Sequence, residues 1–197
     1  MVFLLRGKRN GFFVEIGAAN GILFSNTLIL ERDFQWRGIL AEPARCWHAE
    51  LKANRHVAID TRFVWSKTGE TIEFKETESP DLSTMIGLVD RDFNRTARVN
   101  GITYSLNTVS LNDLLANHEC PREIDYLSLD TEGTELAILQ AFDFARYDIK
   151  IITVEHNFCE PERQQIQHLM NNNGFIRLFE PLSKFDDWYV AKPLLSV

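Results

Sequence analysis

The feature that most constrains the fold is an alternation of short apolar runs with helical patterns. The run from Gly11 to Gly17 precedes a helical pattern from about Ser25 to Asp33, and the run from Gly38 to Glu42 precedes an amphipathic stretch from Ala44 to Asn54. Strands that alternate with helices build a mostly parallel sheet with right-handed crossovers. We therefore predict an α/β fold of the doubly wound, Rossmann-like type.

The second half of the chain continues this alternation. The pattern predicts a strand over Asp125 to Asp130, a helix over Glu132 to Phe142 and a β-branched central strand over Ile149 to Glu155. A helix over 161–173 and two strands over 175–179 and 188–191 close the chain. No helix separates those two strands, so we expect a C-terminal antiparallel hairpin at one sheet edge.

The middle of the chain predicts less regular structure. Short strands are expected over 57–60 and 71–75, and Ser110 is expected to cap a helix, with Asp113 completing a capping box. Residues 79–100 are polar and charged, so we expect a surface insertion or lid on one domain that spans 1–197. Three arginines of this insertion, Arg91, Arg95 and Arg98, are expected on a solvated helix face.

Composition excludes several classes of protein. A net charge of −7 and a pI near 5.3 argue against a general nucleic-acid binder, which needs clustered cations. Cys46, Cys120 and Cys159 show neither paired nor zinc-ligand spacing, which favours a reducing, cytoplasmic setting. The apolar opening residues stop at Arg6, far short of the roughly 20 residues that cross a bilayer. We expect neither a nucleic acid nor a membrane as partner.

The first predicted strand ends in a loop of small residues that leads into a helix. Small residues over 17–21 let the backbone approach a ligand, while the G-x-G-x-x-G dinucleotide pattern is absent. The Glu15 carboxylate would repel a pyrophosphate but could hold an ammonium group. Glu42, at the end of the next strand, is placed to accept hydrogen bonds from two ribose hydroxyls.

The fourth and fifth of the strands expected in this sheet end in a second group of polar residues. Asp130 or His156 could serve as a general base, with Glu132 beside them. Alternatively, Asp130, Glu155 and Asn157 could be oxygen ligands for Mg²⁺ that polarises a substrate hydroxyl. The structural alternatives are that Glu132 caps the following helix and that His156 packs under the insertion.

Four segments, in order, resemble the successive motifs of the FkbM family of methyltransferases. They are Phe-Val-Glu-Ile-Gly-Ala-Ala-Asn-Gly at 13–21, Ala-Glu-Pro at 41–43, Asp-Tyr-Leu-Ser-Leu-Asp-Thr-Glu-Gly at 125–133 and Val-Glu at 154–155. The resemblance implies a seven-stranded class I fold with strand order 3-2-1-4-5-7-6 and S-adenosyl-L-methionine as cofactor. It usually implies methyl transfer to oxygen.

The resemblance also implies roles for particular residues. Those expected at the methionine end of the cofactor are Glu15, Gly17, Ala18, Asn20 and Gly21. Glu42 would hold the ribose, and Trp65 and Ser66 lie in the stretch that contacts adenine, although Trp65 could equally be a core tryptophan. The expected acceptor is a hydroxyl on a small molecule or glycan, such as a sugar or secondary metabolite. The competing hypotheses are an NAD-dependent oxidoreductase, opposed by the missing glycine pattern, and a non-catalytic cofactor-binding module.

Overall fold

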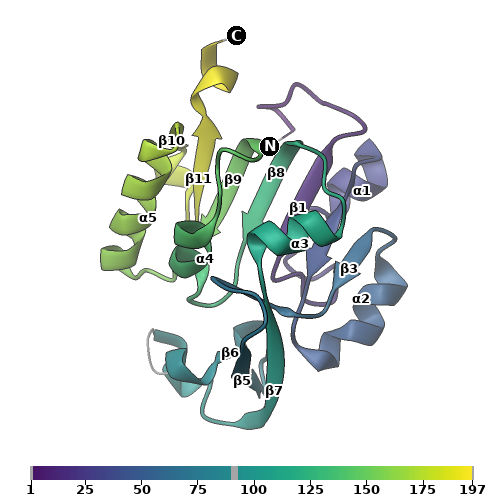
Figure 1. Cartoon of the computed structure of the whole chain (residues 1–197), viewed down its shortest axis with the longest axis vertical. Helices are drawn as coiled ribbons and strands as arrows, with labels where there is room; N and C mark the ends of the chain where they lie inside the picture. Colours follow the sequence, from purple (N-terminus) through teal and green to yellow (C-terminus); the bar gives the residue numbers. More distant parts are fainter. Residues whose placement is uncertain (1, 90–92, 197) are drawn as a thin grey trace.

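A computed structural model describes residues 2–89 and 93–196, so Arg91 lies outside the described residues. A seven-stranded sheet forms the centre of the fold (Figure 1). Its strands, in spatial order, are β10 (Phe175–Leu178), β11 (Asp186–Ala191), β9 (Asp148–Glu155), β8 (Glu123–Leu129), β1 (Phe12–Ile16), β2 (Arg37–Ala41) and β3 (Ala58–Asp60). β3, β2, β1, β8 and β9 are parallel, whereas β10 and β11 are antiparallel, which confirms the predicted C-terminal hairpin.

The strand labels along this sheet differ from the expected order 3-2-1-4-5-7-6. The difference arises because four strands of another sheet, β4 to β7, occur in the chain between β3 and β8. Counted among themselves in chain order, the seven strands of the large sheet follow the sequence 3-2-1-4-5-7-6. The sequence pattern predicted strands over 57–60 and 71–75 but did not predict a separate sheet.

The two faces of the large sheet bury different helices. Val14 and Ile39 point to a core shared with α3 (Leu111–Asn117), α4 (Glu135–Ala141) and α5 (Glu160–Asn172). Their neighbours Phe13 and Leu40 point to the opposite core, which includes buried leucines of α1 (Leu28–Phe34) and α2 (His48–Asn54). This alternation follows from the two-residue period of a strand, and burial on both faces explains why the runs are almost wholly apolar.

The second sheet has four strands and lies beyond the carboxyl ends of the large sheet, below it in Figure 1. Its strands, in spatial order, are β4 (Phe63–Trp65), β7 (Gly101–Ser110), β5 (Thr71–Thr77) and β6 (Thr84–Met85). Phe63, Phe74 and Ala44 form its small buried core, against which Trp65 and Tyr104 pack. This sheet therefore contributes apolar side chains to the edge of the large sheet where ligands bind in α/β folds.

Short 3-10 helices complete the structure. They are η1 (Arg45–Trp47), η2 (Pro80–Leu82), η3 (Ile86–Leu88), η4 (Phe93–Thr96), η5 (Glu180–Leu182) and η6 (Lys192–Ser196). Within the described part of the chain, no helix combines the length and apolar character needed to cross a bilayer.

Several local predictions can be compared with the structure. Ser110 caps α3, since its side chain accepts a hydrogen bond from the Asp113 amide, but the Asp113 carboxylate bonds to the Thr68 hydroxyl instead of completing a capping box. The helix expected from Glu132 begins only at Glu135, because Glu132 has a left-handed φ of 59° that a helix cannot contain.

The prediction that the arginines of residues 79–100 form a solvated helix face is wrong for Arg98. Its side chain is completely buried, whereas Arg95 is exposed as expected. Arg98 is buried because its guanidinium pairs with Glu132, in the loop between β8 and α4. Polar composition alone did not distinguish a solvated arginine from one that is buried against a carboxylate.

Candidate active site

A pocket opens at the carboxyl ends of β1, β2 and β8, between the two sheets. Three of its walls come from the large sheet and its loops: Gly17 and Ala19 after β1, Glu42 after β2, and Asp130 and Glu132 after β8. The remaining wall is formed by the second sheet and by residues near η2, including Phe63, Phe74, Pro80, Asp81 and Ser83. The structure thus brings together four of the residues predicted to form a site, Gly17, Glu42, Asp130 and Glu132.

Gly17 makes the close approach between two of these walls possible. Its φ is +87°, and a Cβ atom at this position would lie 1.8 Å from the Asp130 carbonyl oxygen. Its amide donates to the Ala41 carbonyl at 2.9 Å, while the Asp130 amide donates to the Ile16 carbonyl. Only glycine allows the β1, β2 and β8 ends to meet at this point, which explains the glycine at this sequence position.

Glu15 lies beneath the loop and is absent from the pocket lining among the described residues. Its buried carboxylate accepts hydrogen bonds from the Asn26 amide at 2.6 Å and from the hydroxyls of Thr27 and Ser25 at 2.6 and 3.0 Å. An Arg55 nitrogen lies 3.6 Å away. Burial raises the pKa of Glu15, while these donors oppose that shift. The carboxylate that was predicted to hold an ammonium group instead organises the loop from β1 to α1.

The remaining predicted residues of this loop also support it from outside the pocket. Ala18 is buried against the core, and the Asn20 side chain accepts from the amides of Ile22 and Leu23. Gly21 adopts a φ of +79°, and its carbonyl accepts from Arg55. These residues shape the backbone around the pocket.

Glu42 faces the pocket in the position predicted for it. Its two carboxylate oxygens each accept one backbone hydrogen bond, from Ala19 at 2.8 Å and from Ala44 at 2.7 Å. Burial raises the pKa of Glu42 to about 7, and the two amides oppose the shift. Because each carboxylate oxygen can accept a second hydrogen bond, the group retains acceptor capacity toward a ligand.

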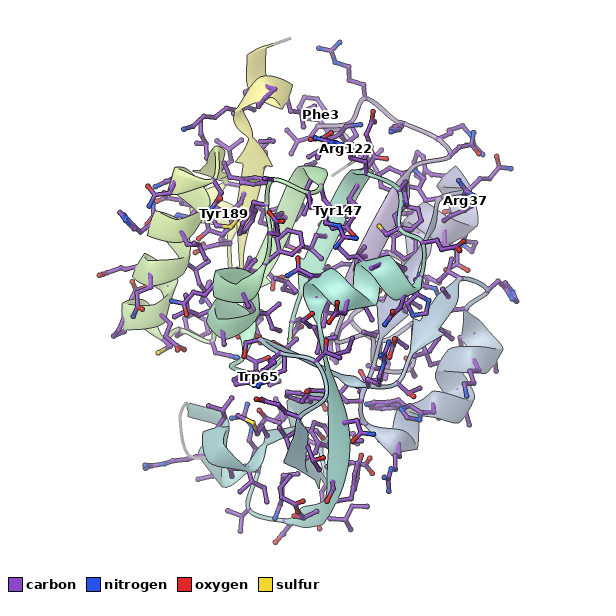
Figure 2. The ribbon with its side chains drawn as sticks, in the orientation of Figure 1. Phe3, Arg37, Trp65, Arg122, Tyr147 and Tyr189 are labelled. Carbon is purple, nitrogen blue, oxygen red and sulfur yellow. The ribbon has the colours of Figure 1, made fainter. Side chains whose placement is uncertain are left out.

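Aromatic side chains form a wall of the pocket beside Glu42. The polar group in this wall, the Trp47 indole nitrogen, was not predicted. Trp47, Phe63 and Phe74 line the pocket, and the buried Trp47 indole nitrogen has no hydrogen-bond partner among residues 2–89 and 93–196. Trp65 packs against the small core between the two sheets, where Figure 2 labels it, and Ser66 follows it outside the pocket lining of the described residues. Among the described residues the tryptophan of the pocket lining is therefore Trp47, which the helical spacing of 44–54 had assigned only to an amphipathic face.

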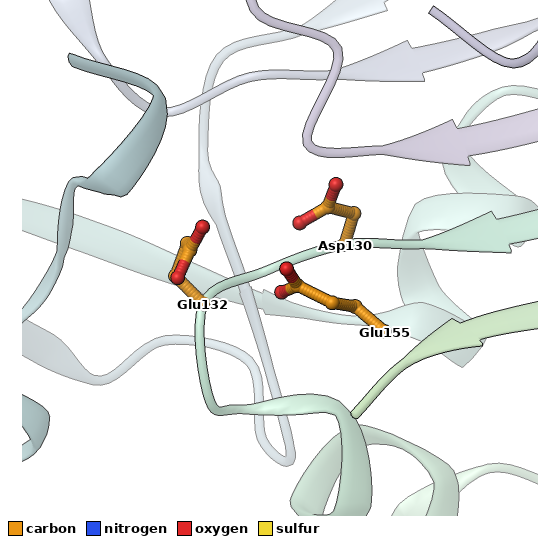
Figure 3. Close-up of side chains that lie close together, drawn as sticks. All are labelled: Asp130, Glu132 and Glu155. Carbon is orange, nitrogen blue, oxygen red and sulfur yellow. The ribbon is translucent and has the colours of Figure 1, made fainter. Parts of the chain in front are cut away.

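Three carboxylates converge beyond Gly17, as Figure 3 shows. Asp130 and Glu132 follow β8 and Glu155 ends β9, and one oxygen of each lies within 4.8 Å of the others. Adjacent parallel strands place their carboxyl ends at the same sheet edge, so residues distant in sequence meet here. The sequence prediction that Asp130, Glu132 and Glu155 form one group agrees with this geometry.

Asp130 and Glu155 differ in pKa, although burial raises the pKa of both. Burial, followed by the Asp130 charge, raises the pKa of Glu155 to about 12, so Glu155 carries a proton at neutral pH. Burial also raises the pKa of Asp130, to about 7, although a hydrogen bond from Glu155 opposes the shift. The charges of Asp186, Glu135 and Glu15 add to it. Asp130 and Glu155 are therefore a pair that holds one proton.

Glu132 is compensated by cationic and amide donors. Arg98 Nη2 lies 2.6 Å from Glu132 Oε2, with the arginine side chain fully buried. The Asn157 side-chain amide donates to Glu155 at 2.8 Å and to Glu132 at 3.4 Å. Asn157 thus presents its NH₂ group to the carboxylates, not its oxygen.

His156 does not face this cluster. Its Nδ1 accepts a hydrogen bond from the Phe158 amide at 3.1 Å, and its ring packs edge-on against the Phe158 ring. Burial lowers the pKa of His156, with Arg163 contributing. The residue leaves β9 on the side away from Asp130, because successive residues of an extended strand point in opposite directions.

Glu135 is a supporting residue that sequence reasoning did not assign. Its buried carboxylate accepts from the Thr131 amide at 2.7 Å, from the Thr131 hydroxyl and from the Gly133 amide. Glu135 thus fixes the loop between Asp130 and α4. This is the capping role that the sequence pattern offered as an alternative for Glu132. The third acid of the Asp-Thr-Glu-Gly-Thr-Glu segment was the available signal.

A match to a protein-family model shows which family of proteins this chain belongs to. The model of the methyltransferase FkbM domain matches residues 15–188. The chain belongs to the FkbM methyltransferase family. This family implies S-adenosyl-L-methionine as the cofactor, and nothing in the match supports an NAD-dependent oxidoreductase.

A solved structure of an FkbM methyltransferase shows the same fold. The methyltransferase FkbM from Methylobacillus flagellatus KT matches with a TM-score of 0.54 at 11% identity, over 92% of this chain and 43% of that one. A precorrin-6y C5,15-methyltransferase from Geobacter metallireducens GS-15 matches at 0.49 and 8% identity, over 96% and 83%. No curated protein matches this sequence. This FkbM-family chain thus spans less than half the length of the Methylobacillus flagellatus methyltransferase.

Proposed function

We propose that this FkbM-family protein is an S-adenosyl-L-methionine-dependent methyltransferase that acts on a hydroxyl group of a small-molecule or glycan acceptor. The observation that carries the proposal is one pocket that combines residues suited to bind a nucleoside with a group of acidic residues. Its lining includes Glu42, after β2, with the aromatic residues Trp47, Phe63 and Phe74, and also Asp130 and Glu132, which follow β8 on the other side of β1.

The pocket residues fit the proposed cofactor. The Glu42 carboxylate has acceptor capacity for ribose hydroxyls, and the Trp47 indole N–H is a buried donor that a nitrogen of the adenine base could satisfy. The bound cofactor supplies an electrophilic methyl group on a sulfonium sulfur. An ionised Asp130 carboxylate in the pocket lining would favour this cation electrostatically.

Asp130 is the proposed general base. A hydroxyl acceptor must lose its proton as it attacks a methyl carbon, and a base whose pKa is near the working pH serves this best. Asp130 lines the pocket and has a pKa of about 7, while the protonated Glu155 donates a hydrogen bond to it. Glu155 therefore keeps the accepting carboxylate oriented, and the acceptor proton moves to Asp130.

The alternative of Mg²⁺ ligation by Asp130, Glu155 and Asn157 is not part of this proposal. The arginine nitrogen at 2.6 Å from Glu132 already supplies positive charge to the cluster, and Asn157 directs donors at Glu155 and Glu132. Metal ligation requires oxygen atoms with free lone pairs. Calorimetric titration with MgCl₂ alone tests this point, and micromolar Mg²⁺ binding that Asp130→Asn abolishes would favour the metal mechanism.

The first test of function is calorimetric titration of the protein with S-adenosylhomocysteine, with NAD in parallel. We expect micromolar binding of S-adenosylhomocysteine alone, weakened about tenfold or more by Glu42→Ala because a buried carboxylate loses two ligand contacts. Glu123→Ala, an exposed glutamate at the start of β8 and thus at the sheet edge opposite the pocket, is the matched control. Absence of S-adenosylhomocysteine binding would favour a scaffold role over catalysis.

The second test measures turnover. Incubation with methyl-labelled cofactor and a panel of sugars, glycans and hydroxylated metabolites should transfer label, and Asp130→Asn should reduce kcat by at least about a hundredfold. Label found on nitrogen instead of oxygen would correct the acceptor class. A panel member labelled equally by wild type and Asp130→Asn would remove Asp130 from the mechanism.

A further inference from the structure

Arg98 is a buried cation outside the pocket lining described above. Its side chain is fully buried, it follows η4, and its Nε donates to the Leu82 carbonyl at 2.8 Å. Its Nη2 donates to Glu132 Oε2 at 2.6 Å. Removing a guanidinium from water is expensive unless it meets a carboxylate in good geometry, so this contact fixes where Glu132 must lie.

A second contact from the same region fixes the backbone of Glu132. The hydroxyl of Thr84, a fully buried residue of β6, donates to the Glu132 carbonyl at 2.9 Å. Glu132 has φ 59°, a left-handed conformation that costs a non-glycine residue free energy unless its surroundings enforce it. Arg98 therefore holds the side-chain carboxylate of Glu132, and Thr84 holds its backbone carbonyl.

Glu132 in turn connects to the reacting pair. Asn157, which itself has φ 43°, donates to both Glu132 and Glu155, and one carboxylate oxygen each of Glu132, Glu155 and Asp130 lie within 4.8 Å of one another. The second sheet is thus connected to Asp130 through polar residues in close contact. The connection runs through Glu132, Asn157 and Glu155.

We propose that Arg98 and Thr84 are positioning residues, which act through Glu132 to hold the Asp130–Glu155 pair against the pocket. Neither side chain lines the pocket among the described residues. The inference rests on the proposed function only in taking Asp130 as the base. The second sheet would thereby contribute to catalysis as well as forming a wall.

Hydrogen exchange followed by mass spectrometry tests the inference without cofactor or acceptor. The amides of Thr131 and Gly133 are held by Glu135 in the loop that Arg98 and Thr84 secure. In Arg98→Met, exchange over residues 130–135 should accelerate about tenfold, and in Thr84→Val about threefold, with β1 and β9 unchanged. Arg98→Lys keeps the charge and should restore part of the protection.

The matched control is Arg95→Met, an exposed arginine of the same segment, which should leave the loop unchanged. Unaltered exchange over 130–135 in a folded Arg98→Met would overturn the inference, as would acceleration spread evenly over the core, because that pattern indicates a merely structural role. If Arg98→Met does not fold, Thr84→Val and Arg98→Lys decide the question by the same criterion. Because no cofactor is added, failure here is distinguishable from failure of the methyltransferase proposal.

Discussion

Two acidic regions meet at the carboxyl edge of the large sheet, and their carboxylates have opposite surroundings. After β1 and β2, Glu15 and Glu42 are surrounded by amide and hydroxyl donors, with Arg55 beside Glu15. After β8 and β9, Asp130 and Glu155 lie against each other and against Glu132. Donors stabilise a buried charge, whereas neighbouring carboxylates destabilise it. Glu15 therefore supports the fold, Glu42 keeps acceptor capacity toward a ligand, and Asp130 and Glu155 share one proton.

The largest expected effect lies in the first region. Glu15→Ala removes the acceptor of three hydrogen bonds and leaves Arg55 without one of its buried carboxylates, so we expect a loss of about 3–5 kcal/mol in the free energy of unfolding. Urea denaturation measures it. Glu31→Ala, which removes the less buried carboxylate that pairs with Arg55, should cost clearly less. Equal losses for both variants would show that Glu15 is not the organising group.

The next effect concerns the junction of the two regions. Gly17→Ala places a methyl group 1.8 Å from the Asp130 carbonyl oxygen, whereas Gly69, with a similar φ of +84°, has open space around its Cβ position. Both variants suffer the left-handed backbone, about 1–2 kcal/mol, so the excess destabilisation of Gly17→Ala reports the close approach alone. We expect an excess of at least about 2 kcal/mol. Matching urea midpoints for the two variants would contradict the close approach.

The third prediction concerns pH in the second region. The pKa of Asp130 is raised to about 7 in the folded protein, above its value in an unfolded chain of about 3.9. The folded state therefore binds more protons, and the stability contributed by protonated Asp130 is present below pH 4 and lost as the pH rises through 7. Asp130→Asn should remove about 3 kcal/mol of this decline between pH 5 and pH 8.

Urea denaturation at pH 5 and pH 8 measures that decline. Glu42→Gln provides the comparison, because the pKa of Glu42 is also raised to about 7 but its neighbours are donors. If Asp130→Asn proves less stable than wild type at pH 8, the carboxylate is stabilised by its surroundings, and the contrast between the two regions fails.

The smallest effect tests the ligand end of the first region. Trp47→Phe removes the buried, unsatisfied indole N–H of a tryptophan that lines the pocket, and Trp65→Phe removes a tryptophan that packs against the small core. We expect S-adenosylhomocysteine affinity to fall about threefold to tenfold for Trp47→Phe, the value of one hydrogen bond, and to stay unchanged for Trp65→Phe. The reverse result in calorimetry would restore Trp65 as the base contact.

The sequence predicted the strands and helices of the large sheet better than it predicted the directions of individual side chains. Apolar runs and glycines predicted the strands of the large sheet, its C-terminal hairpin and the acids at strand ends, because strand periodicity and sheet-edge geometry are local or topological properties. Side-chain directions were less accessible. Glu15 points beneath the loop and His156 away from Asp130, since each depends on which buried donors and rings fold against it.

The sequence by itself determined the family, the central sheet and the identity of the acids that end its strands. Only the tertiary structure decided which of those acids are neutralised by donors and which oppose one another, and that Trp47 and Arg98 contribute from outside the expected motifs. The physical reason is that burial and Coulomb interactions depend on distances between segments far apart in the chain. A sequence pattern records residue types but not those distances.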